Sequence, residues 1–159
     1  MRLAAILIAL AGTIYAIDPE IPHGAIYAPD QLRHRWREAP IAQVAGGKVL
    51  GVTKNNVTAF YGVPYAKAKR YAAAAPTSWS GVRDATVPAE PCPQMAHGVI
   101  GHEDCLVANV FTAGIPNSPM MLQIHGGSMN AGRAVADGSA LAKRAKAGIV
   151  SVQYRLGGL

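Results

Sequence analysis

The sequence has few charged and few aromatic residues. Asp, Glu, Lys and Arg make up 15% of the 159 residues, and Phe, Trp and Tyr make up 6%. Half of the residues are hydrophobic, which excludes a disordered chain and favours a globular domain with a sizeable core. The net charge is +6, but the basic residues are scattered, with mild clusters in QLRHRWRE (31–38) and KAKR (67–70). Because no basic stripe with interleaved aromatic residues is present, we expect no nucleic-acid binding.

The sequence also lacks the ligand spacings of a metal site. Its histidines do not form the pairs that zinc sites use. They lie at positions 23, 34, 97, 102 and 125. We therefore expect no metal, and no cofactor is indicated.

No later hydrophobic run is long enough to span a membrane, so the first residues of the chain carry the only such signal. Residues 1–16, MRLAAILIALAGTIYA, predict a secretory signal peptide. Arg2 supplies the positive charge, residues 3–11 form the apolar core, and cleavage follows Ala16 or, alternatively, Ala11. A membrane anchor is the alternative interpretation, but the run is shorter than the ~20 residues that a spanning helix requires. We therefore expect a secreted protein.

Only two cysteines are present. A secreted chain with two cysteines is expected to pair them, so we predict a disulfide between Cys92 and Cys105. Closing this short loop would stabilise the fold by roughly 3 kcal/mol. Asn56-Val57-Thr58 is a glycosylation sequon, and it predicts Asn56 as the acceptor in a secreted protein.

The first part of the chain divides into a leader and a pair of strands. Residues 17–45 are rich in proline and predict an extended leader, with a candidate helix over 31–38 that is either docked or mobile. Two strands are predicted at 48–53 and 57–66. They flank Asn55-Asn56, a pair that tolerates positive φ and suits a hairpin turn.

The second part of the chain changes pattern after an irregular stretch at 67–104. Strands are predicted at 106–112, 119–125 and 148–154, with a helix at 137–148. Asp137 is the candidate N-cap of that helix, and Gly148 is its candidate C-terminal stop. A strand, a glycine turn, a helix and a strand form a βαβ unit, so the sequence predicts an α/β protein with a parallel sheet.

Seven segments, taken in order, resemble the N-terminal part of the type-B carboxylesterases, the esterase and lipase family that includes the cholinesterases. They are GKVLGV (47–52), FYGVPYA (60–66), KRYAAAAP with Trp79 and Asp84-Ala85, PCPQ (91–94), HEDCLVANVF (102–111), MLQIHGGSMNAG (121–132) and VSVQYRLGGL (150–159). The resemblance implies that residues 46–159 form the N-terminal part of an α/β-hydrolase fold, truncated. In that fold a small antiparallel sheet precedes a mostly parallel central sheet.

The resemblance also implies a role for the residues that follow the strand ending in His125. In this family the loop after His-Gly-Gly supplies the backbone N–H groups of the oxyanion hole, and the matching donors here are Gly127 and Ser128, with Gly126 shaping the turn. Such N–H groups stabilise the negative charge of a tetrahedral intermediate in ester hydrolysis. Ser128 stands where the family often has a third glycine, and Met129 replaces a common aromatic residue. A plain tight turn is the alternative interpretation, and His125 matches a structural residue of the family rather than the catalytic base.

Further matches to the family concern structure. Cys92 and Cys105 match its first disulfide, and Arg70 and Glu103 match a buried or partly buried salt bridge that fixes the disulfide loop. Arg155 matches an arginine whose acidic partner lies beyond residue 159. The disulfide loop contains no aromatic residue, whereas cholinesterases place a cation-binding Trp there, so choline esters are not expected as substrates.

No serine lies in the G-x-S-x-G pattern that carries the nucleophile of this fold. The serines are at positions 78, 80, 118, 128, 139 and 151. We therefore expect the nucleophile, acid and base to be absent and the chain alone to be inactive. We interpret the chain as the N-terminal portion of a secreted carboxylic-ester hydrolase that, when complete, acts on small-molecule or lipid esters. The alternatives are a non-catalytic secreted binding or adhesion protein derived from the fold, and a small stand-alone regulator.

Overall fold

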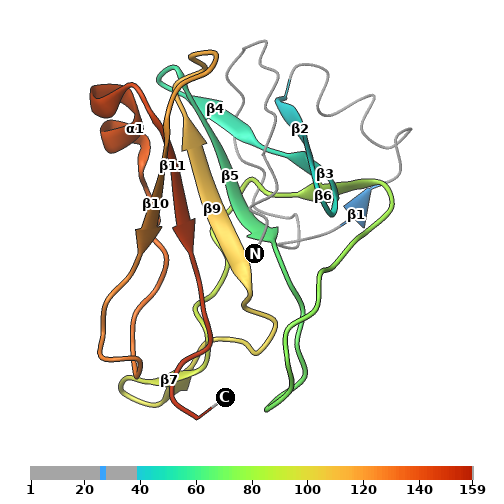
Figure 1. The fold of residues 1–159 in the computed structure, drawn as a ribbon, viewed down its shortest axis with the longest axis vertical. Coiled ribbons are helices and arrows are strands. Elements are labelled where there is room, and N and C mark those ends of the chain that lie inside the picture. Colours follow the sequence, from blue (N-terminus) through green and yellow to red (C-terminus); the bar gives the residue numbers. More distant parts are fainter. Residues whose placement is uncertain (1–25, 28–38, 159) are drawn as a thin grey trace.

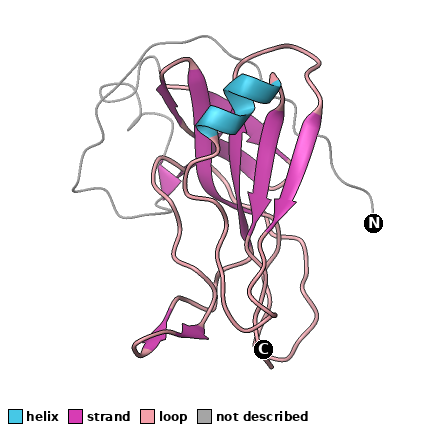
Figure 2. Cartoon of the chain, turned by 90° about the vertical axis from the view of Figure 1, so that its left-hand side faces the viewer, coloured by secondary structure: helices cyan, strands magenta, loops and turns pink. Residues whose placement is uncertain are grey.

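Residues 26–27 and 39–158 are described by a computed structural model. The predicted signal peptide, the candidate helix over 31–38 and most of the leader lie outside these residues. In the described part, the chain builds three layers: a short helix, a five-stranded sheet and a four-stranded sheet (Figures 1 and 2). The elements, in chain order, are β1 (Ile26–Tyr27), β2 (Ile41–Val44), β3 (Gly47–Leu50), β4 (Val52–Lys54), β5 (Val57–Pro64), β6 (Val82–Asp84), β7 (Gln94–Met95), β8 (Val99–Ile100), β9 (Val107–Thr112), β10 (Met120–Ile124), α1 (Ser139–Ala145) and β11 (Gly148–Val152).

The five-stranded sheet has the order β10-β11-β9-β5-β4. β10 and β11 pair in parallel, as the predicted βαβ unit requires, and α1 connects them. The other three strand pairs are antiparallel. The parallel unit predicted from the sequence is therefore confirmed, within a sheet whose pairing is mixed.

The central strand β9 is buried along its whole length because both faces of the sheet are covered. On one face, Val110 packs with Phe60 and Val49, between this sheet and the four-stranded one. On the other face, Phe111 packs with Ala142 of α1 and with Ile149 of β11. Burying a side chain of this size contributes about 1.5–3 kcal/mol, so β9 forms the centre of the core.

The four-stranded sheet has the order β1-β6-β3-β2. β3 and β6 pair in parallel, while the other pairs are antiparallel, so the small sheet is mixed rather than antiparallel as expected. β2 lies within residues 17–45, which the sequence analysis assigned to the leader, and it pairs with β3 through Ala42 and Val49.

The strand predicted over 48–53 is wrong as a single element. The chain divides at Gly51, with β3 in the small sheet and β4 in the larger one. A Cβ atom at Gly51 would lie 2.6 Å from the Ala59 carbonyl oxygen and 2.6 Å from the Phe60 ring. Glycine at this position therefore lets the chain pass closely over β5 as it moves from one sheet to the other.

The predicted hairpin turn is confirmed. β4 and β5 pair antiparallel up to Lys54 and Val57. Asn55 and Asn56 between them have φ values of 51° and 60°, the left-handed conformation that a two-residue hairpin loop needs.

The helix is shorter than predicted, and its ends differ from the expected ones. Its N-cap is Gly138, not Asp137, although an Asp137 carboxylate oxygen accepts a hydrogen bond from the Ser139 N–H at 2.8 Å. At its other end Lys146 adopts a left-handed conformation with φ 49° and ends the helix, whereas Gly148 already belongs to β11. Only Ala142 of the helix is buried, because a helix of two turns touches the sheet along a narrow stripe.

No helix in the described part of the chain is long and apolar enough to cross a membrane.

Candidate functional site

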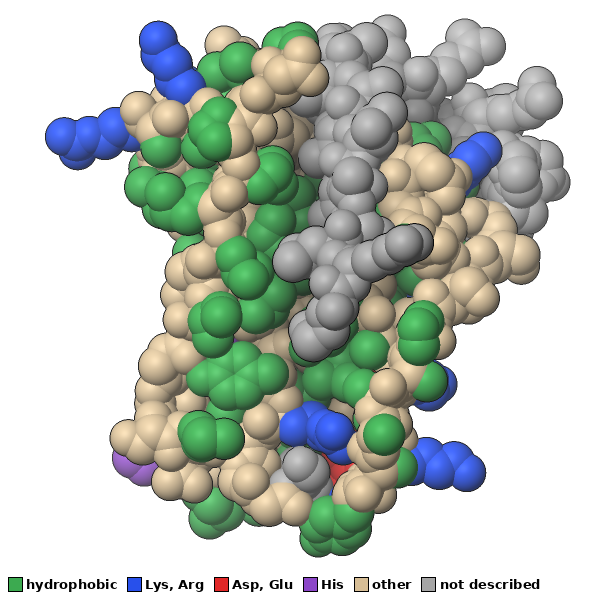
Figure 3. Space-filling model, in the orientation of Figure 1, with side chains coloured by type: hydrophobic (Ala, Val, Ile, Leu, Met, Phe, Trp, Pro, Cys, Tyr) green, Lys and Arg blue, Asp and Glu red, His purple; other side chains and the backbone are tan. Residues whose placement is uncertain are grey.

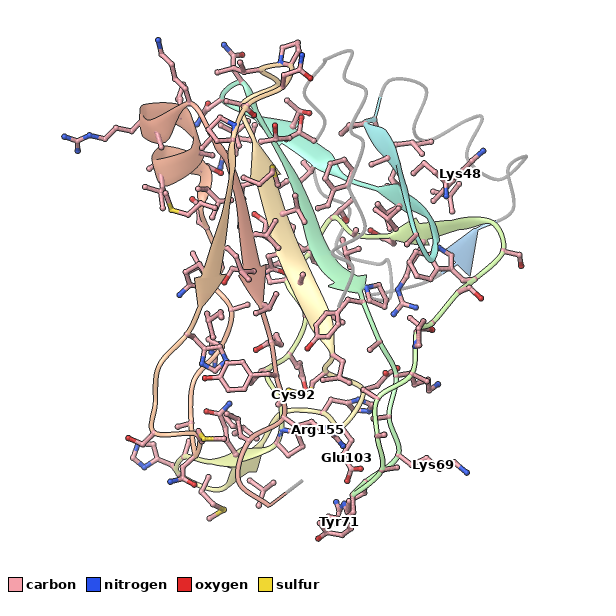
Figure 4. The ribbon with its side chains drawn as sticks, in the orientation of Figure 1. Lys48, Lys69, Tyr71, Cys92, Glu103 and Arg155 are labelled. Atoms are coloured by element: carbon pink, nitrogen blue, oxygen red, sulfur yellow. A yellow bond between two sulfur atoms is a disulfide. The ribbon has the colours of Figure 1, made fainter. Side chains whose placement is uncertain are left out.

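The candidate site lies at the end of the five-stranded sheet where β10 and β11 end. Residues 125–132, which we call the HGGS loop, follow β10 directly. The segment that holds Cys92 and Glu103, and the segment around Lys69 and Tyr71, lie at the same end of the molecule (Figures 1 and 4). The carboxyl ends of parallel strands are the usual place for a ligand site in an open α/β sheet.

The N–H groups of Gly127 and Ser128 donate no hydrogen bond within residues 39–158. The carbonyl group of Gly127, by contrast, accepts hydrogen bonds from the N–H groups of Asn130 at 3.0 Å and of Ala131 at 3.1 Å. The Gly127 carbonyl oxygen therefore closes a tight turn. The N–H groups of Gly127 and Ser128 have no acceptor among the described residues. Residues 126–130 are exposed, so this part of the loop lies at the surface of the described part of the chain.

Two glycines of the loop, Gly127 and Gly132, are sterically required. Gly127 has φ +121°, and a Cβ atom there would lie 1.8 Å from the Ala131 carbonyl oxygen. Gly132 has φ +127°, and a Cβ atom there would lie 2.2 Å from Nδ1 of His125. A Cβ atom at Gly126 would meet no atom of the described residues within 4 Å. The close backbone packing that shapes the turn therefore depends on Gly127 and Gly132.

Ser128 and Met129 have φ values of 52° and 60°. Non-glycine residues seldom adopt this left-handed conformation, and such residues are often found at functional sites. The Met129 carbonyl oxygen accepts a hydrogen bond from the Gly157 N–H at 2.6 Å. This contact holds the middle of the HGGS loop against the segment after β11.

His125 holds the start of the loop. Its side chain is buried and stacks on the Tyr154 ring, with the ring centroids 4.3 Å apart. The Tyr154 hydroxyl donates to the His125 carbonyl oxygen at 2.5 Å, and His125 Nδ1 lies 2.9 Å from the Gly126 carbonyl oxygen. Its ring is thus engaged in packing the loop onto the segment after β11.

Gln94 is a residue of the site that the sequence analysis did not single out. Its side-chain oxygen accepts a hydrogen bond from the Gly132 N–H at 2.9 Å, and its amide nitrogen donates to the Gly132 carbonyl oxygen at 2.8 Å. The same nitrogen lies 3.1 Å from the Cys92 carbonyl oxygen. Gln94 lies in the segment PCPQ (91–94) that resembles the family, but nothing in the sequence indicates its contact with Gly132.

Buried polar side chains from β9, from β11 and from the residue after β11 hold the chain after the HGGS loop. The Gln153 side-chain oxygen accepts a hydrogen bond from the Ala134 N–H at 3.1 Å, and the Ser151 hydroxyl accepts one from the Val135 N–H at 2.8 Å. The side-chain amide of Asn109 donates to the Val135 carbonyl oxygen at 2.9 Å. These three side chains are buried and hydrogen-bonded, as buried polar groups generally are.

The predicted disulfide between Cys92 and Cys105 is present, with a Cα–Cα distance of 5.0 Å. Both cysteines are buried, and they pack with Leu156. The disulfide therefore fixes the base of the segment that carries Gln94.

The predicted pair of Arg70 and Glu103 is also present, but it is exposed, whereas a buried or partly buried pair was expected. The two side chains are 54% and 47% exposed. The hydrogen bond with Glu103 raises the pKa of the Arg70 guanidinium. An exposed ion pair of this kind contributes little to stability, so its effect is to join the segment around Arg70 to the disulfide loop.

Arg155 has a partner within this chain. Its Nη1 donates to the Ala72 carbonyl oxygen at 2.8 Å. Figure 4 shows Arg155 and Glu103 on the same side of the molecule as Tyr71 and Lys69. This hydrogen bond joins the segment after β11 to the segment around Tyr71.

Burial raises the pKa of the Tyr65 hydroxyl, which donates to the Gln153 carbonyl oxygen at 2.6 Å.

Among residues 26–27 and 39–158, no three His, Cys, Asp or Glu side chains are grouped so that they could hold a metal ion.

Comparison with known proteins identifies the family. The sequence profile of the Carboxylesterase family matches residues 38–159. The para-nitrobenzyl esterase of Bacillus subtilis is 38% identical over 129 residues, which cover 70% of this chain and 26% of that protein. Mouse carboxylesterase 3B is 37% identical over 147 residues, which cover 76% of this chain and 25% of that protein. The chain thus spans about a quarter of the length of these relatives.

Solved structures give the same result. A PNB esterase structure matches with a TM-score of 0.68 and 39% identity, over 74% of this chain and 27% of that one. A carboxylesterase of Geobacillus stearothermophilus matches with a TM-score of 0.66 and 28% identity, over 74% of this chain and 26% of that one. The expected α/β-hydrolase fold is confirmed by these neighbours. The chain belongs to the carboxylesterase family.

Proposed function

We propose that the protein is a secreted carboxylic-ester hydrolase in which the HGGS loop supplies the oxyanion hole. The backbone N–H groups of Gly127 and Ser128 would donate to the oxygen of the tetrahedral intermediate. The observation that carries this proposal is that neither N–H group is committed to another described residue, while the surrounding loop is held from several sides.

Ester hydrolysis requires N–H donors that are free of other hydrogen bonds and fixed in position. When a nucleophile attacks an ester, the carbonyl oxygen gains negative charge, and N–H groups fixed before the reaction stabilise that charge without reorganising. Each such donor contributes roughly 3–4 kcal/mol to the stability of the transition state. Family membership supports an ester as the substrate, of small-molecule or lipid type. The attacking hydroxyl is not assigned to any residue of this chain, because none of its serines lies in G-x-S-x-G.

Secretion is part of the proposal. Three features support it: the signal-like pattern of residues 1–16, the disulfide between Cys92 and Cys105, and the exposed position of Asn56 in the hairpin turn. Disulfides persist in oxidising compartments, and an exposed sequon is accessible to glycosylation.

A chimera tests the role of the loop. Residues 38–159 would replace the matching segment of the Bacillus subtilis para-nitrobenzyl esterase, and hydrolysis of p-nitrophenyl acetate would be measured. We expect Gly127→Ala to lower kcat by roughly 10²–10³-fold with a smaller change in KM, because the added Cβ would force the Ala131 carbonyl oxygen and the neighbouring amides apart.

The matched control is Gly158→Ala, because a Cβ atom at Gly158 meets no atom within 4 Å in the described part of the chain. It should leave kcat unchanged. If Gly127→Ala hydrolyses the ester as fast as Gly158→Ala does, the loop is not the oxyanion hole.

The 159-residue chain alone provides a second test. We expect it to give no hydrolysis of p-nitrophenyl acetate above the buffer rate. Turnover that a serine-directed organophosphate abolishes would show that one of its serines is a nucleophile after all.

A further inference from the structure

We propose that Gln94 is the positioning residue of the HGGS loop, and that it couples this loop to the Cys92–Cys105 disulfide. The consequence for catalysis rests on the function proposed above, whereas the coupling itself does not.

The geometry is a reciprocal pair of hydrogen bonds. One carboxamide, that of Gln94, engages both the N–H and the carbonyl oxygen of Gly132, at 2.9 Å and 2.8 Å. The two residues are 38 positions apart in the sequence. A carboxamide can form this pair because it carries a donor and an acceptor in one plane, whereas an ionised carboxylate only accepts and an ammonium only donates.

The contact fixes more than Gly132. A Cβ atom at Gly132 would lie 2.2 Å from Nδ1 of His125 and 2.4 Å from the Gly126 carbonyl oxygen, so the end of the loop packs directly on its start. In the same way, a Cβ atom at Gly127 would lie 1.8 Å from the carbonyl oxygen of Ala131, the neighbour of Gly132. A shift of Gly132 would therefore move the backbone next to the two proposed N–H donors.

We call the pair of hydrogen bonds between Gln94 and Gly132 the clamp. The disulfide holds its Gln94 side. The Gln94 amide nitrogen lies within hydrogen-bond distance of the Cys92 carbonyl oxygen, and both cysteines are 1% exposed. Gln94 also begins β7, which pairs with β8 inside the disulfide loop. The side chain is thus anchored in one cross-linked loop and holds the end of another.

Residue-resolved hydrogen exchange of the 159-residue chain, measured by NMR, tests the clamp without any substrate. Gln94→Met keeps the volume of the side chain but removes the donor and the acceptor. We expect it to speed exchange of the Gly132 N–H about tenfold, which is the effect of losing one hydrogen bond. Exchange at Val110 and Phe111 in β9 should stay unchanged.

Gln43→Ala is the matched control. The Gln43 carboxamide also donates to backbone carbonyl oxygens, those of Val44 at 2.9 Å and Gly47 at 3.1 Å, but in the small sheet. It should leave Gly132 exchange as in the unsubstituted chain. The proposal is overturned if Gln94→Met leaves Gly132 exchange within twofold of the unsubstituted chain, because the side chain would then only fill space.

A second variant decides the case in which Gln94→Met loosens β9 as well. Gln94→Glu keeps the size of the side chain but places a carboxylate oxygen against the Gly132 carbonyl oxygen, so we expect exchange of the Gly132 N–H to rise in this variant while β9 stays protected. Unchanged exchange of the Gly132 N–H in Gln94→Glu would overturn the proposal. In the chimera, Gln94→Met should lower kcat with little change in KM. If the exchange result holds and kcat does not change, the clamp stands and the oxyanion assignment fails.

Discussion

β9 and β10 are apolar strands of the same sheet, but their surroundings differ. All six residues of β9 are buried, and the strand pairs with β5 and β11 on its two sides. Four of the five residues of β10 are exposed, and among the described strands β10 pairs only with β11. Of these two strands, the one that leads into the HGGS loop is thus the less packed, so the loop must be positioned by other contacts.

Those contacts are polar and come from segments distant in sequence. Gln94, Tyr154 and Gly157 hold three points of the HGGS loop. Meanwhile β10 leaves apolar side chains exposed by 45–63%, among them Met121, Leu122 and Ile124. Figure 3 shows hydrophobic side chains running down the face on which β10 and β11 lie. An exposed apolar strand at the edge of a sheet is unusual on the surface of a folded protein.

The largest expected effect is a difference in the free energy of unfolding between a substitution in β9 and one in β10. Phe111→Ala in β9 should lower the free energy of unfolding by about 3–5 kcal/mol, because it opens a cavity between the sheet and α1. Leu122→Ala in β10 should lower it by less than about 1 kcal/mol, since that side chain is 50% exposed. Urea unfolding of the two variants gives both values. Equal losses would mean that β10 is covered in solution.

The next effect concerns the link between the strands. The disulfide lies just before β9, and through Gln94 it holds the end of the loop after β10. Replacing both Cys92 and Cys105 with Ser should lower the free energy of unfolding by roughly 3 kcal/mol, since the closed loop is short. Hydrogen exchange of the Gly132 N–H should rise in the same variant at denaturant concentrations where β9 stays protected. A variant that loses stability but keeps the protection of Gly132 would show that Gln94 does not need the disulfide.

The parts of this molecule that the sequence predicted are those set by local chemistry. Asn55-Asn56 specifies its own turn, and the glycine turn and helix between β10 and β11 specify a parallel pair. The division at Gly51 was not predicted, because the need for glycine there comes from Phe60, nine positions away and on another strand.

The candidate site divides in the same way. The resemblance to the family located the HGGS loop and the pairs Cys92–Cys105 and Arg70–Glu103, and the structure contains both pairs. It did not indicate that Arg70 and Glu103 are exposed, nor that Gln94 holds Gly132, because both depend on how distant segments meet. A single sequence carries no signal for a hydrogen bond between a side chain and a backbone group 38 residues away.

The smallest expected effect is on the pH dependence of the free energy of unfolding. It tests how Asp137 stabilises the start of α1, in the connection from β10. Hydrogen bonds from the Ser139 hydroxyl and backbone N–H lower the pKa of Asp137 below 3.8. A carboxyl group with a lowered pKa in the folded state stabilises the fold above its unfolded pKa, and this stabilisation is lost as the pH falls through the folded pKa. Asp137→Ala should therefore cost less than about 1 kcal/mol near neutral pH, because the group is largely exposed to solvent.

At acidic pH the variant and the unsubstituted chain should differ less in their free energy of unfolding, because the stabilisation by the carboxylate is lost as the pH falls through the folded-state pKa of Asp137. Asp137→Asn is the matched control, since its side-chain oxygen still accepts from the Ser139 N–H but does not titrate. If Asp137→Ala lowers stability by the same amount at both pH values, the hydrogen bonds to the charged carboxylate do not stabilise the start of α1. The connection would then depend on packing alone, in the cluster that Ala142 forms with Phe111 and Ile149.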